Sequence, residues 1–217
     1  MKKGASKVTV IDYGVGNLLS VIRGLEKCGA NVILTDSPDL IADADRLVLP
    51  GVGAFADGIA GLHERMLFDP IKTFSEKNRP FMGICLGMQM MLDTSYEFGE
   101  HKGLGLIPGK VVPIPITNVD GSPHKIPHIG WSGLLHRSAE TTWGGTILEE
   151  IKPKSPVYFV HSFVAKPTQK RHILANCDYN GRRLTSIICS DNLYGCQFHP
   201  EKSGPVGLKI LKNFCDI

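Results

Sequence analysis

One cysteine lies in a sequence setting that suits a nucleophile. Cys85 is the centre of Gly83-Ile84-Cys85-Leu86-Gly87, a G-x-C-x-G pattern between a predicted strand and a predicted helix. In hydrolases with the related G-x-S-x-G pattern, a sharp strand-to-helix turn strains the central residue, and the glycines let neighbouring backbone approach. The adjoining helix N-terminus also favours a thiolate. We predict that Cys85 is a nucleophile; the alternative is a cysteine that packs beside a turn.

A thiol nucleophile needs a base, and His199 is the strongest candidate. The stretch Gln197-Phe198-His199-Pro200-Glu201 closes a predicted strand with polar residues. Strand alternation puts Gln197 and His199 on one face, and Pro200 frees Glu201 to turn back toward the imidazole. A carboxylate placed there holds the imidazole tautomer and stabilises the imidazolium. The sequence thus predicts a triad of Cys85, His199 and Glu201, with a structural histidine as the alternative.

A glycine-rich loop offers the third element of such a site. Pro50-Gly51-Val52-Gly53 follows a predicted strand, so a backbone N–H of this loop can stabilise a tetrahedral oxyanion. Without Cys85 the loop would be only a turn. It is no phosphate loop, because Gly-Lys-Ser/Thr does not follow. Gly14-Val15-Gly16 resembles a dinucleotide fingerprint, but Leu19 occupies the position of its third glycine.

Metal and disulfide chemistry is not indicated. The six cysteines include no C-x-x-C pair, so free thiols are expected in a reducing compartment. His124 and His128 have an interval that suits a metal on a helix, but Pro127 between them argues against the helix. We predict neither a metal site nor a cofactor.

The first half of the chain alternates short strands with longer amphipathic segments. Strands followed by helices in this order predict a parallel sheet with helices on both faces, which places Cys85 at the carboxyl end of the sheet. The expected strands are 8–11, 31–34, 46–49 and 81–84; the expected helices are 18–27, one that begins near 37–38, 56–77 with an interruption near Asp69-Pro70, and 86–92.

The second half is richer in extended segments and predicts a smaller, partly antiparallel extension of that sheet. We find no internal repeat, low-complexity tract or linker, so residues 1–217 are expected to form a single α/β domain with a largely parallel central sheet. The expected strands are 110–112, 158–160, 172–177, 183–189 and 194–198, with a closing helix over 204–214.

Composition excludes several classes of protein. Apolar residues make up 42% and charged residues 21% of the 217, which is ordinary for a globular protein. A net charge of +3 gives no argument for nucleic acid or a membrane surface. No apolar run approaches the length of a membrane span, and the N-terminus has no secretory signal pattern. The expected location is the cytoplasm.

Taken together, the motifs resemble those of the triad (class I) glutamine amidotransferases, in order along nearly the whole chain. Within that family they are most similar to the ammonia-generating subunits of histidine biosynthesis. The elbow and the His-Pro-Glu element carry the resemblance to the family. The matching stretches are 12–17 (Asp-Tyr-Gly-Val-Gly-Asn), 49–55 (Leu-Pro-Gly-Val-Gly-Ala-Phe), 83–89 (Gly-Ile-Cys-Leu-Gly-Met-Gln), 126–131 (Ile-Pro-His-Ile-Gly-Trp), 158–162 (Tyr-Phe-Val-His-Ser) and 197–203 (Gln-Phe-His-Pro-Glu-Lys-Ser).

The resemblance implies a flavodoxin-like glutamine amidotransferase type 1 domain that hydrolyses glutamine to glutamate and ammonia. Cys85 would attack the side-chain amide and form a γ-glutamyl thioester. The Val52 N–H would stabilise the oxyanion, while His199, oriented by Glu201, would protonate the leaving ammonia and activate water. The family's glutamine pocket corresponds to Gly51, Val52, Gly53, Gln89, His161 and Ser162.

The resemblance also implies a partner, a (β/α)8-barrel cyclase that receives ammonia and makes imidazole glycerol phosphate and AICAR. Asn17, Trp131 and Lys202 match family positions near that heterodimer interface. The chain departs from the family pattern at Ser132, where asparagine is usual, at Phe163, where tyrosine is common, and at Cys196, where an aliphatic residue is usual. Because Ser132 and Phe163 fall in segments near the interface, the identity of the acceptor is the most open point.

Three other functions remain open from the sequence. A paralogous subunit would supply ammonia to a synthase that amidates sugar nucleotides for surface polysaccharide. A stand-alone cysteine hydrolase of related fold would turn over without any partner. An inactive regulatory homologue is disfavoured, because Cys85, His199 and Glu201 are all present.

Overall fold

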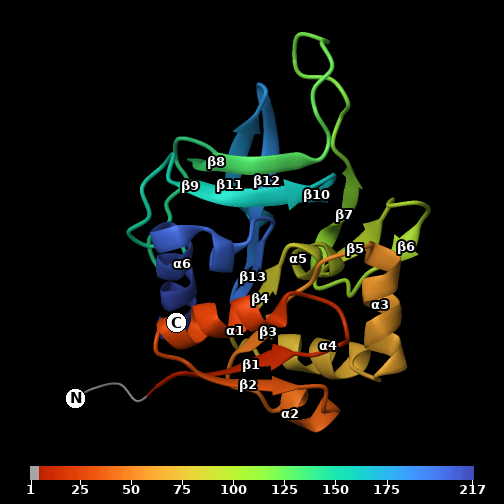
Figure 1. Cartoon of the computed structure of the whole chain (residues 1–217), viewed down its shortest axis with the longest axis vertical. Coiled ribbons are helices and arrows are strands. Elements are labelled where there is room, and N and C mark those ends of the chain that lie inside the picture. The colour runs from red at the N-terminus through yellow and green to blue at the C-terminus, as the bar shows by residue number, and fades with distance from the viewer. Residues whose placement is uncertain (1–4) are drawn as a thin grey trace.

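A computed structural model describes residues 5–217 of the protein. These residues fold around two sheets (Figure 1). The larger sheet has nine strands in the order β2-β1-β3-β4-β13-β12-β11-β8-β9. The smaller sheet has four strands in the order β10-β7-β5-β6. The chain places β4 and β13 side by side at the middle of the larger sheet, although about a hundred residues separate them in sequence.

Five neighbouring strands form the parallel half of the larger sheet. Their residues alternate between two helix layers: Val8 and Val10 of β1 face one layer, and Ile11 faces the other. This half agrees with the predicted parallel sheet. Its strands are β1 (Lys7–Ile11), β2 (Asn31–Thr35), β3 (Leu47–Leu49), β4 (Phe81–Ile84) and β13 (Leu193–Cys196).

Helices cover both faces of the parallel half, as the sequence predicts. Val21, Leu25 and Leu211, from α1 and α6, pack into the core on one face. Phe55, Leu62 and Phe74, from α3 and α4, pack into the core on the other. The helices are α1 (Leu18–Lys27), α2 (Pro38–Ala42), α3 (Phe55–Glu64), α4 (Phe68–Glu76), α5 (Leu86–Met90) and α6 (Gly204–Asp216), with short 3-10 turns η1 (Lys170–His172) and η2 (Pro200–Lys202).

The antiparallel half is wider than the sequence predicts. Beyond β13 the sheet continues through four antiparallel pairings, which equals the number of parallel pairings on the other side. The prediction gave no strand over 128–136, where two glycines interrupt the apolar pattern. These strands are β12 (Arg182–Ser190), β11 (Ile173–Tyr179), β8 (His128–His136) and β9 (Pro156–His161).

The smaller sheet corrects the predicted helix over 86–92. Helix α5 ends at Met90, and Leu92 already pairs with Ile107 of the smaller sheet. Residues 86–92 are buried on every side, so their apolar pattern could not show where helix gives way to strand. The strands of this sheet are β5 (Leu92–Ser95), β6 (His101–Lys102), β7 (Ile107–Pro113) and β10 (Phe163–Pro167).

The predicted break of the 56–77 helix at Asp69-Pro70 is also wrong in position. Helix α3 ends at Glu64, and Met66 takes a left-handed φ of 56° that turns the chain before α4 begins at Phe68. Pro70 instead lies in the first turn of α4. A proline is tolerated there because the N–H it lacks would have no partner within the helix.

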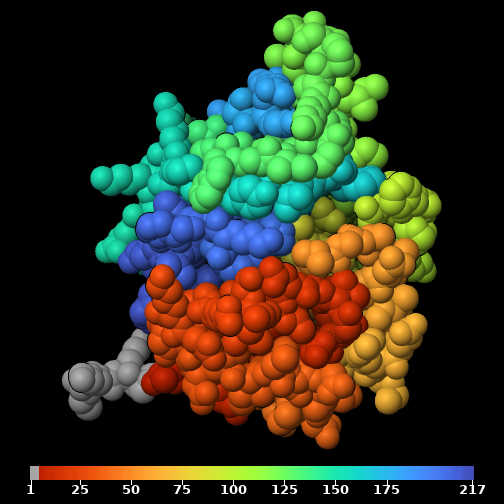
Figure 2. Space-filling view, viewed as in Figure 1, coloured from red at the N-terminus to blue at the C-terminus, as the bar shows by residue number. Residues whose placement is uncertain are grey.

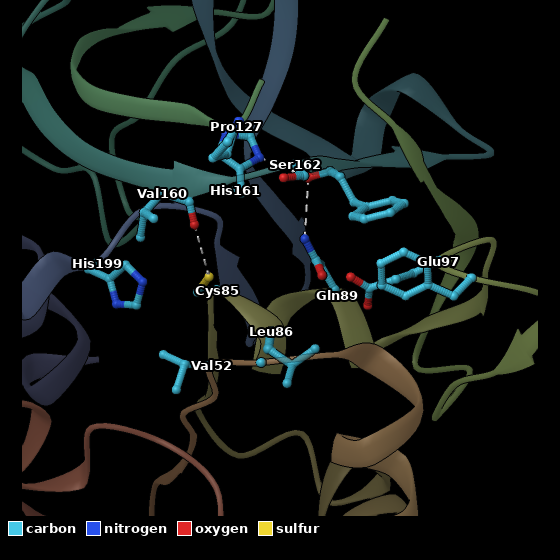
Figure 3. A pocket seen from close by; sticks show the side chains of 13 residues that line it. Val52, Cys85, Leu86, Gln89, Glu97, Pro127, Val160, His161, Ser162 and His199 are labelled. Carbon is cyan, nitrogen blue, oxygen red and sulfur yellow. Dashed lines mark hydrogen bonds between the residues drawn. The ribbon is translucent and has the colours of Figure 1, made fainter. Parts of the chain in front are cut away.

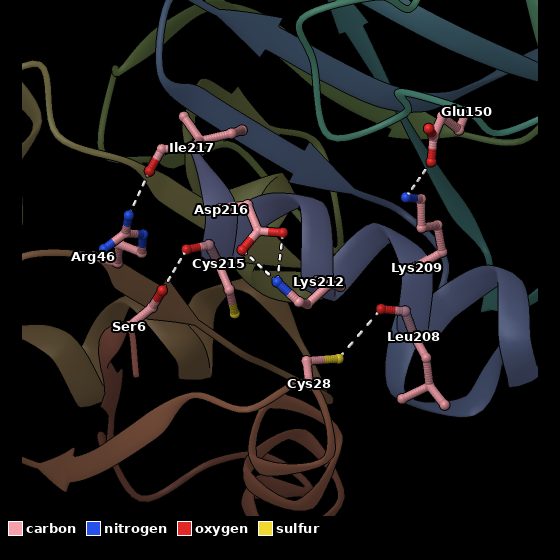
Figure 4. A network of polar contacts seen from close by, with 10 residues as sticks. All are labelled: Ser6, Cys28, Arg46, Glu150, Leu208, Lys209, Lys212, Cys215, Asp216 and Ile217. Atoms are coloured by element: carbon pink, nitrogen blue, oxygen red, sulfur yellow. Dashed lines mark hydrogen bonds and ion pairs between the residues drawn. The ribbon is translucent and has the colours of Figure 1, made fainter. Parts of the chain in front are cut away.

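The C-terminal helix is bound to three segments of the first fifty residues by polar contacts (Figure 4). Ser6 Oγ donates to the Cys215 carbonyl at 2.6 Å, and Cys28 Sγ donates to the Leu208 carbonyl at 3.2 Å. The guanidinium of Arg46 also donates to the carbonyl of Ile217. Helix α6 is thus held against both β1 and α1, which fixes the segment that directly precedes it, 197–203.

The segment between β7 and β8 projects from the body of the molecule (Figure 1 and Figure 2). Its side chains include Ile116 and Val119, which are 76% and 68% exposed.

Among the helices of residues 5–217, none combines the length and the apolar character that a membrane span requires.

Candidate active site

The strand-to-helix turn at Cys85 has the strained geometry that its sequence pattern predicts. Cys85 lies between β4 and α5 with φ 52° and ψ −107°, a conformation that L-residues rarely adopt. Its N–H donates to the Cys196 carbonyl at 2.7 Å, and its carbonyl accepts from Gln89 N at 3.1 Å. The turn is therefore fixed by the neighbouring strand β13 and by α5, and Sγ stands at the carboxyl end of the sheet.

The two glycines of the motif are required by close packing. A Cβ on Gly83 would lie 2.7 Å from Met88 N, and a Cβ on Gly87 would overlap the carbonyl oxygen of Leu49. Any side chain at either position would push the turn out of place. The glycines thus let β3, β4 and α5 meet tightly beneath Cys85.

His199 and Glu201 form a buried pair beside the cysteine. Nδ1 of His199 lies 2.8 Å from Oε1 of Glu201, and only 3% and 1% of the two side chains are exposed. Because a carboxylate only accepts, Nδ1 carries the proton and donates it, which leaves Nε2 as the basic nitrogen. Within residues 5–217, Nε2 has no hydrogen-bond partner. Figure 3 shows His199 and Cys85 bordering the same cavity.

The charge state of His199 follows from these neighbours. Burial on its own lowers the pKa of His199, but Cys85 and Glu201 more than offset that effect and raise the pKa to about 9. The imidazolium of His199 is therefore stable at neutral pH next to the carboxylate of Glu201. A thiolate with a protonated imidazole is the form in which cysteine nucleophiles react.

Backbone bonds from β9 fix the position of His199. Its N–H donates to the Tyr158 carbonyl at 3.0 Å, and its carbonyl accepts from Ser203 Oγ at 2.6 Å. Ser203 Oγ in turn accepts the Tyr158 N–H at 3.0 Å. Ser203, buried and only 1% exposed, thus links the His-Pro-Glu turn to the strand that leads into the cavity.

A cavity of about 620 Å³ opens over Cys85 (Figure 3). Most of the predicted site residues line it: Val52, Gly53, Cys85, Gln89, His161, Ser162 and His199. The sequence did not predict a place in the pocket for six further lining residues, which are Leu86, Glu97, Phe98, Pro127, Val160 and Phe163.

Gly51 is the one predicted pocket residue that the structure does not place in the cavity. It lies beneath the loop, where a Cβ would collide with the hydroxyl of Tyr13 and come within 2.9 Å of Leu86 Cβ. Tyr13 donates its hydroxyl to the Pro50 carbonyl at 2.7 Å and so anchors the loop from below. Gly51 therefore lets the loop pack onto α5, while Val52, 39% exposed, reaches the cavity.

Two histidines form a second buried pair at the opposite wall. His161 Nδ1 lies 2.8 Å from the Phe163 carbonyl, which only accepts, so Nδ1 is the protonated nitrogen. His161 Nε2 then accepts from His128 Nδ1 at 3.0 Å, and His128 Nε2 accepts from Ser132 Oγ at 3.0 Å. Burial lowers the pKa of both histidines to about 4. Both are therefore neutral, and this pair does not act as an acid at neutral pH.

The residues predicted for a partner interface are exposed. Asn17 and Lys202 lie at the surface, and Trp131 is 56% exposed. Trp131 lies on the outer face of β8, where Ile129 is 52% exposed and pairs with Val160 of β9. Exposed aromatic and aliphatic residues in one place favour a protein contact.

Residues 5–217 contain no group of three or more His, Cys, Asp or Glu that could hold a metal ion. His124 precedes β8, whose first residue is His128, and the two histidines bond to different partners. His124 instead lies 2.5 Å from the Pro115 carbonyl through Nε2.

Several site residues could not be found by local motifs. Glu97 and Phe98 belong to a loop after β5 that reaches the cavity only because the smaller sheet folds beside α5. His128 and His161 are brought together by the β8–β9 pairing. The sequence shows His128 in the matching stretch 126–131 and His161 in the matching stretch 158–162, but it has no signal that pairs the two histidines.

Comparison with known proteins identifies the family of the chain. The family model for glutamine amidotransferase class-I matches residues 9–217, so the chain belongs to that family. The HisH 1 subunit of imidazole glycerol phosphate synthase from Legionella pneumophila (strain Lens) is 54% identical over 98% of this chain and 100% of its own length. The HisH subunit of Syntrophotalea carbinolica is 44% identical over 97% of this chain and 100% of its own.

At such identities over nearly whole chains, the protein falls within the HisH family of imidazole glycerol phosphate synthase subunits. The fold is similar to that of a solved glutamine amidotransferase, which matches with a TM-score of 0.71 at 15% identity, covering 97% of this chain and 99% of its own. The structure titled PurLQS from Thermotoga maritima matches with a TM-score of 0.69 at 19% identity, covering 98% of each chain. The protein is a glutamine amidotransferase subunit of histidine biosynthesis, and the α/β fold class predicted from its sequence is confirmed.

Proposed function

We propose that Cys85, His199 and Glu201 hydrolyse glutamine to glutamate and ammonia, and that the ammonia passes to a (β/α)8-barrel cyclase. The observation that carries this proposal is the strained Cys85 at the floor of a cavity bordered by the unpaired Nε2 of a buried, carboxylate-paired His199. This is the arrangement of a nucleophile, a base and an orienting acid.

The polar groups that line the cavity suit glutamine. The carboxylate of Glu97 lies at the rim, where Oε2 accepts the Phe55 N–H at 2.5 Å, and it can receive the α-ammonium group of the substrate. Gln89 keeps Oε1 for the substrate, because its Nε2 donates to Phe163 and Gln197. The segment of His161 and Ser162 borders the end where an α-carboxylate would lie.

The first half-reaction forms a thioester. Cys85 Sγ adds to the side-chain carbonyl carbon of glutamine, and the Val52 N–H stabilises the oxyanion that forms. His199 then donates its Nε2 proton to the amide nitrogen, the C–N bond breaks and ammonia leaves. Glu201 holds Nδ1 throughout, so the imidazole keeps the correct nitrogen toward the substrate.

The second half-reaction restores the enzyme. Neutral His199 removes a proton from water, and the resulting hydroxide adds to the thioester carbonyl. The C–S bond breaks, glutamate is released, and the thiolate again lies beside the imidazolium. One histidine serves as acid and then as base, which matches a pKa raised to about 9 in the resting state and lower once the thiolate is consumed.

An acceptor partner is required by the chemistry of ammonia. In bulk water at neutral pH, ammonia is protonated and is no longer a nucleophile, so a closed route to a second site is needed. The outer face of β8 and β9, with Ile129, Trp131 and Val160, supports docking of the cyclase in a heterodimer, with Asn17 and Lys202 at its edge. The acceptor reaction would make imidazole glycerol phosphate and AICAR.

Two further expectations belong to this proposal. Residues 1–217 act as a single amidotransferase domain, and the protein works in the cytoplasm. The free state of all six cysteines supports a reducing compartment.

A cysteine exchange tests the proposal. Glutamate release is measured with and without the cyclase for Cys85→Ala and for Cys189→Ala, a matched change at a cysteine that does not line the cavity. Cys85→Ala is expected to lower the rate by about 10³-fold or more while it still binds the cyclase, and Cys189→Ala to leave the rate near its original value. Retained hydrolysis in Cys85→Ala would exclude the mechanism.

A further inference from the structure

A fully buried amide lies next to the reactive sulfur, and the mechanism above does not use it. Gln197 is 0% exposed and directly follows β13, where its N–H donates to the Ser186 carbonyl at 2.9 Å. Its Nε2 lies 3.9 Å from Cys85 Sγ. A buried side chain held by its backbone on one side and facing the nucleophile on the other has little freedom to turn elsewhere.

The hydrogen bonds around Gln197 decide which end of its amide faces the sulfur. The Phe163 carbonyl can only accept, so Gln89 must turn its Nε2 toward it, at 3.3 Å. The second N–H of Gln89 Nε2 then points to Gln197 at 3.2 Å, and only Oε1 of Gln197 can accept it. The remaining end of Gln197, the NH₂ group, is thereby directed at Cys85 Sγ.

The opposite orientation of Gln197 is excluded by the same bonds. If its amide were turned over, two NH₂ groups would face each other at 3.2 Å, and a carbonyl oxygen would face the sulfur. A backbone carbonyl on β10 thus fixes the amide of α5, and that amide fixes the one after β13. The sequence adjacency of Gln197 to the His-Pro-Glu element gives no hint of this chain of bonds.

We infer that Gln197 donates an N–H to the Cys85 sulfur and stabilises the thiolate that attacks the substrate, which makes it a further catalytic residue. A buried anion needs donors, and hydrogen bonds to an ionised acceptor are stronger than those between neutral groups. The imidazolium of His199 favours the thiolate through its charge until its Nε2 proton goes to the leaving group. Gln197 supplies a hydrogen-bond donor at 3.9 Å, which keeps its protons throughout the reaction.

The inference deepens the proposed function, and its test does not require glutamine. The pH dependence of Cys85 alkylation by iodoacetamide is measured by mass spectrometry of the peptide that contains Cys85, which separates it from the other five cysteines. Gln197→Met keeps the size and removes the donor. Gln197→Glu keeps the shape and puts a carboxylate, which only accepts, against the sulfur.

A graded response is expected. Gln197→Met is expected to move the midpoint of alkylation upward by about one pH unit and to slow alkylation at neutral pH by about tenfold. Gln197→Glu is expected to move the midpoint further, because a negative charge opposes the thiolate. Ser186→Ala serves as the matched control, since it changes a buried neighbour whose carbonyl still accepts the Gln197 N–H, and it is expected to leave the midpoint unchanged.

A merely structural Gln197 would give a different pattern. It would lower the melting temperature of both variants and leave the midpoint of alkylation where it is in the unaltered protein, which would overturn the inference. If Gln197→Met does not fold, Gln197→Asn retains the amide but withdraws it by one methylene, and an unchanged midpoint in that variant would equally overturn the inference.

Steady-state kinetics separate this inference from the proposed function. With the cyclase present, Gln197→Met is expected to lower kcat about tenfold with little change in KM, because the donor acts on the nucleophile and not on bound substrate. If the unaltered protein hydrolysed no glutamine while the alkylation midpoints still shifted, the proposed function would fail and the role of Gln197 would stand.

Discussion

His199 and His161 line one cavity, and burial acts on both, yet their pKa values move in opposite directions. His199 has the carboxylate of Glu201 on Nδ1 and Cys85 as a neighbour, and its pKa is raised to about 9. His161 has a carbonyl on Nδ1 and a neutral imidazole on Nε2, and its pKa is lowered to about 4. The nature of the partner atom, more than the depth of burial, decides which imidazole can move protons.

The comparison also separates chemistry from positioning. We call the pair of His199 and Glu201 the charged site; its two residues are two apart in sequence, so its geometry is short-range and stiff. We call the pair of His128 and His161 the neutral site; it joins strands β8 and β9 and holds the segment of His161 and Ser162 at the cavity. Breaking each pair should therefore have a different signature: loss of the charged pair changes the rate and the stability at alkaline pH, and loss of the neutral pair changes the stability at acid pH.

The largest effect is expected from removal of the carboxylate at the charged site. Glu201→Gln keeps the shape of the side chain but leaves the buried imidazolium without an anion, so the pKa of His199 falls and its tautomer is no longer fixed. We expect kcat for glutamine hydrolysis with the cyclase to fall by about 10²- to 10⁴-fold. Glu149→Gln, at an exposed residue, is the control; an equal loss in both variants would contradict the assignment.

The neutral site should make the protein sensitive to acid. The pKa values of His128 and His161 are lowered to about 4 from the ordinary value of about 6.5, so between these values the unfolded chain binds more protons. Their contribution to the free energy of unfolding is present above about pH 6.5 and is lost as the pH falls toward 4. Urea unfolding from pH 7 to pH 4 measures it.

The size of this acid effect is about 3 kcal/mol for each histidine. A double variant, His128→Leu with His161→Gln, should show a flatter slope over the same pH range. A slope identical to that of the unaltered protein would show that the pair titrates normally.

The charged site should act on stability in the alkaline direction. The pKa of His199 is raised to about 9 from 6.5, so the folded protein binds the extra proton between these values. This contribution is fully present below about pH 6.5 and is lost as the pH rises through 9. Chemical unfolding from pH 7 to pH 10 in the unaltered protein and in His199→Asn isolates it; parallel curves would refute it.

The smallest effect is expected at the outer end of the neutral pair. Ser132→Ala removes the hydroxyl that donates to His128 Nε2 and leaves that buried nitrogen without a donor. We expect the free energy of unfolding to fall by about 1 kcal/mol with a small change in glutaminase rate. Thr142→Ala, whose hydroxyl accepts an exposed N–H, is the comparison, and an equal loss there would remove any special role for Ser132.

The turn at Cys85 and the contact between His199 and Glu201 could be predicted because their signals are local. The turn at Cys85 needs Gly83 and Gly87 within two residues, and Glu201 reaches His199 across a single proline. The parallel strands were predictable for the same reason, since each is a short apolar run closed by a turn signal.

The remainder depends on contacts between distant segments. The neutral pair exists only because β8 and β9 align His128 with His161, and the cavity rim includes Glu97 only because β5 leaves α5 at Met91. No local sequence pattern predicts either of these strand positions. Gly51 shows that a residue within a correctly expected loop can also have another role, because it allows close packing against Tyr13 and Leu86 beneath the cavity.

The two faces of strand β8 carry different kinds of side chain. Ile129 and Trp131 point outward, while His128 and Ser132 point inward, where His128 contacts His161. Because alternate side chains of a strand lie on opposite faces, a single inserted or deleted residue before Ile129 would exchange the two sets. On the proposed docking face of β8, changes in acceptor specificity are therefore confined to substitutions at alternate positions, and length changes fall in the projecting segment that precedes the strand.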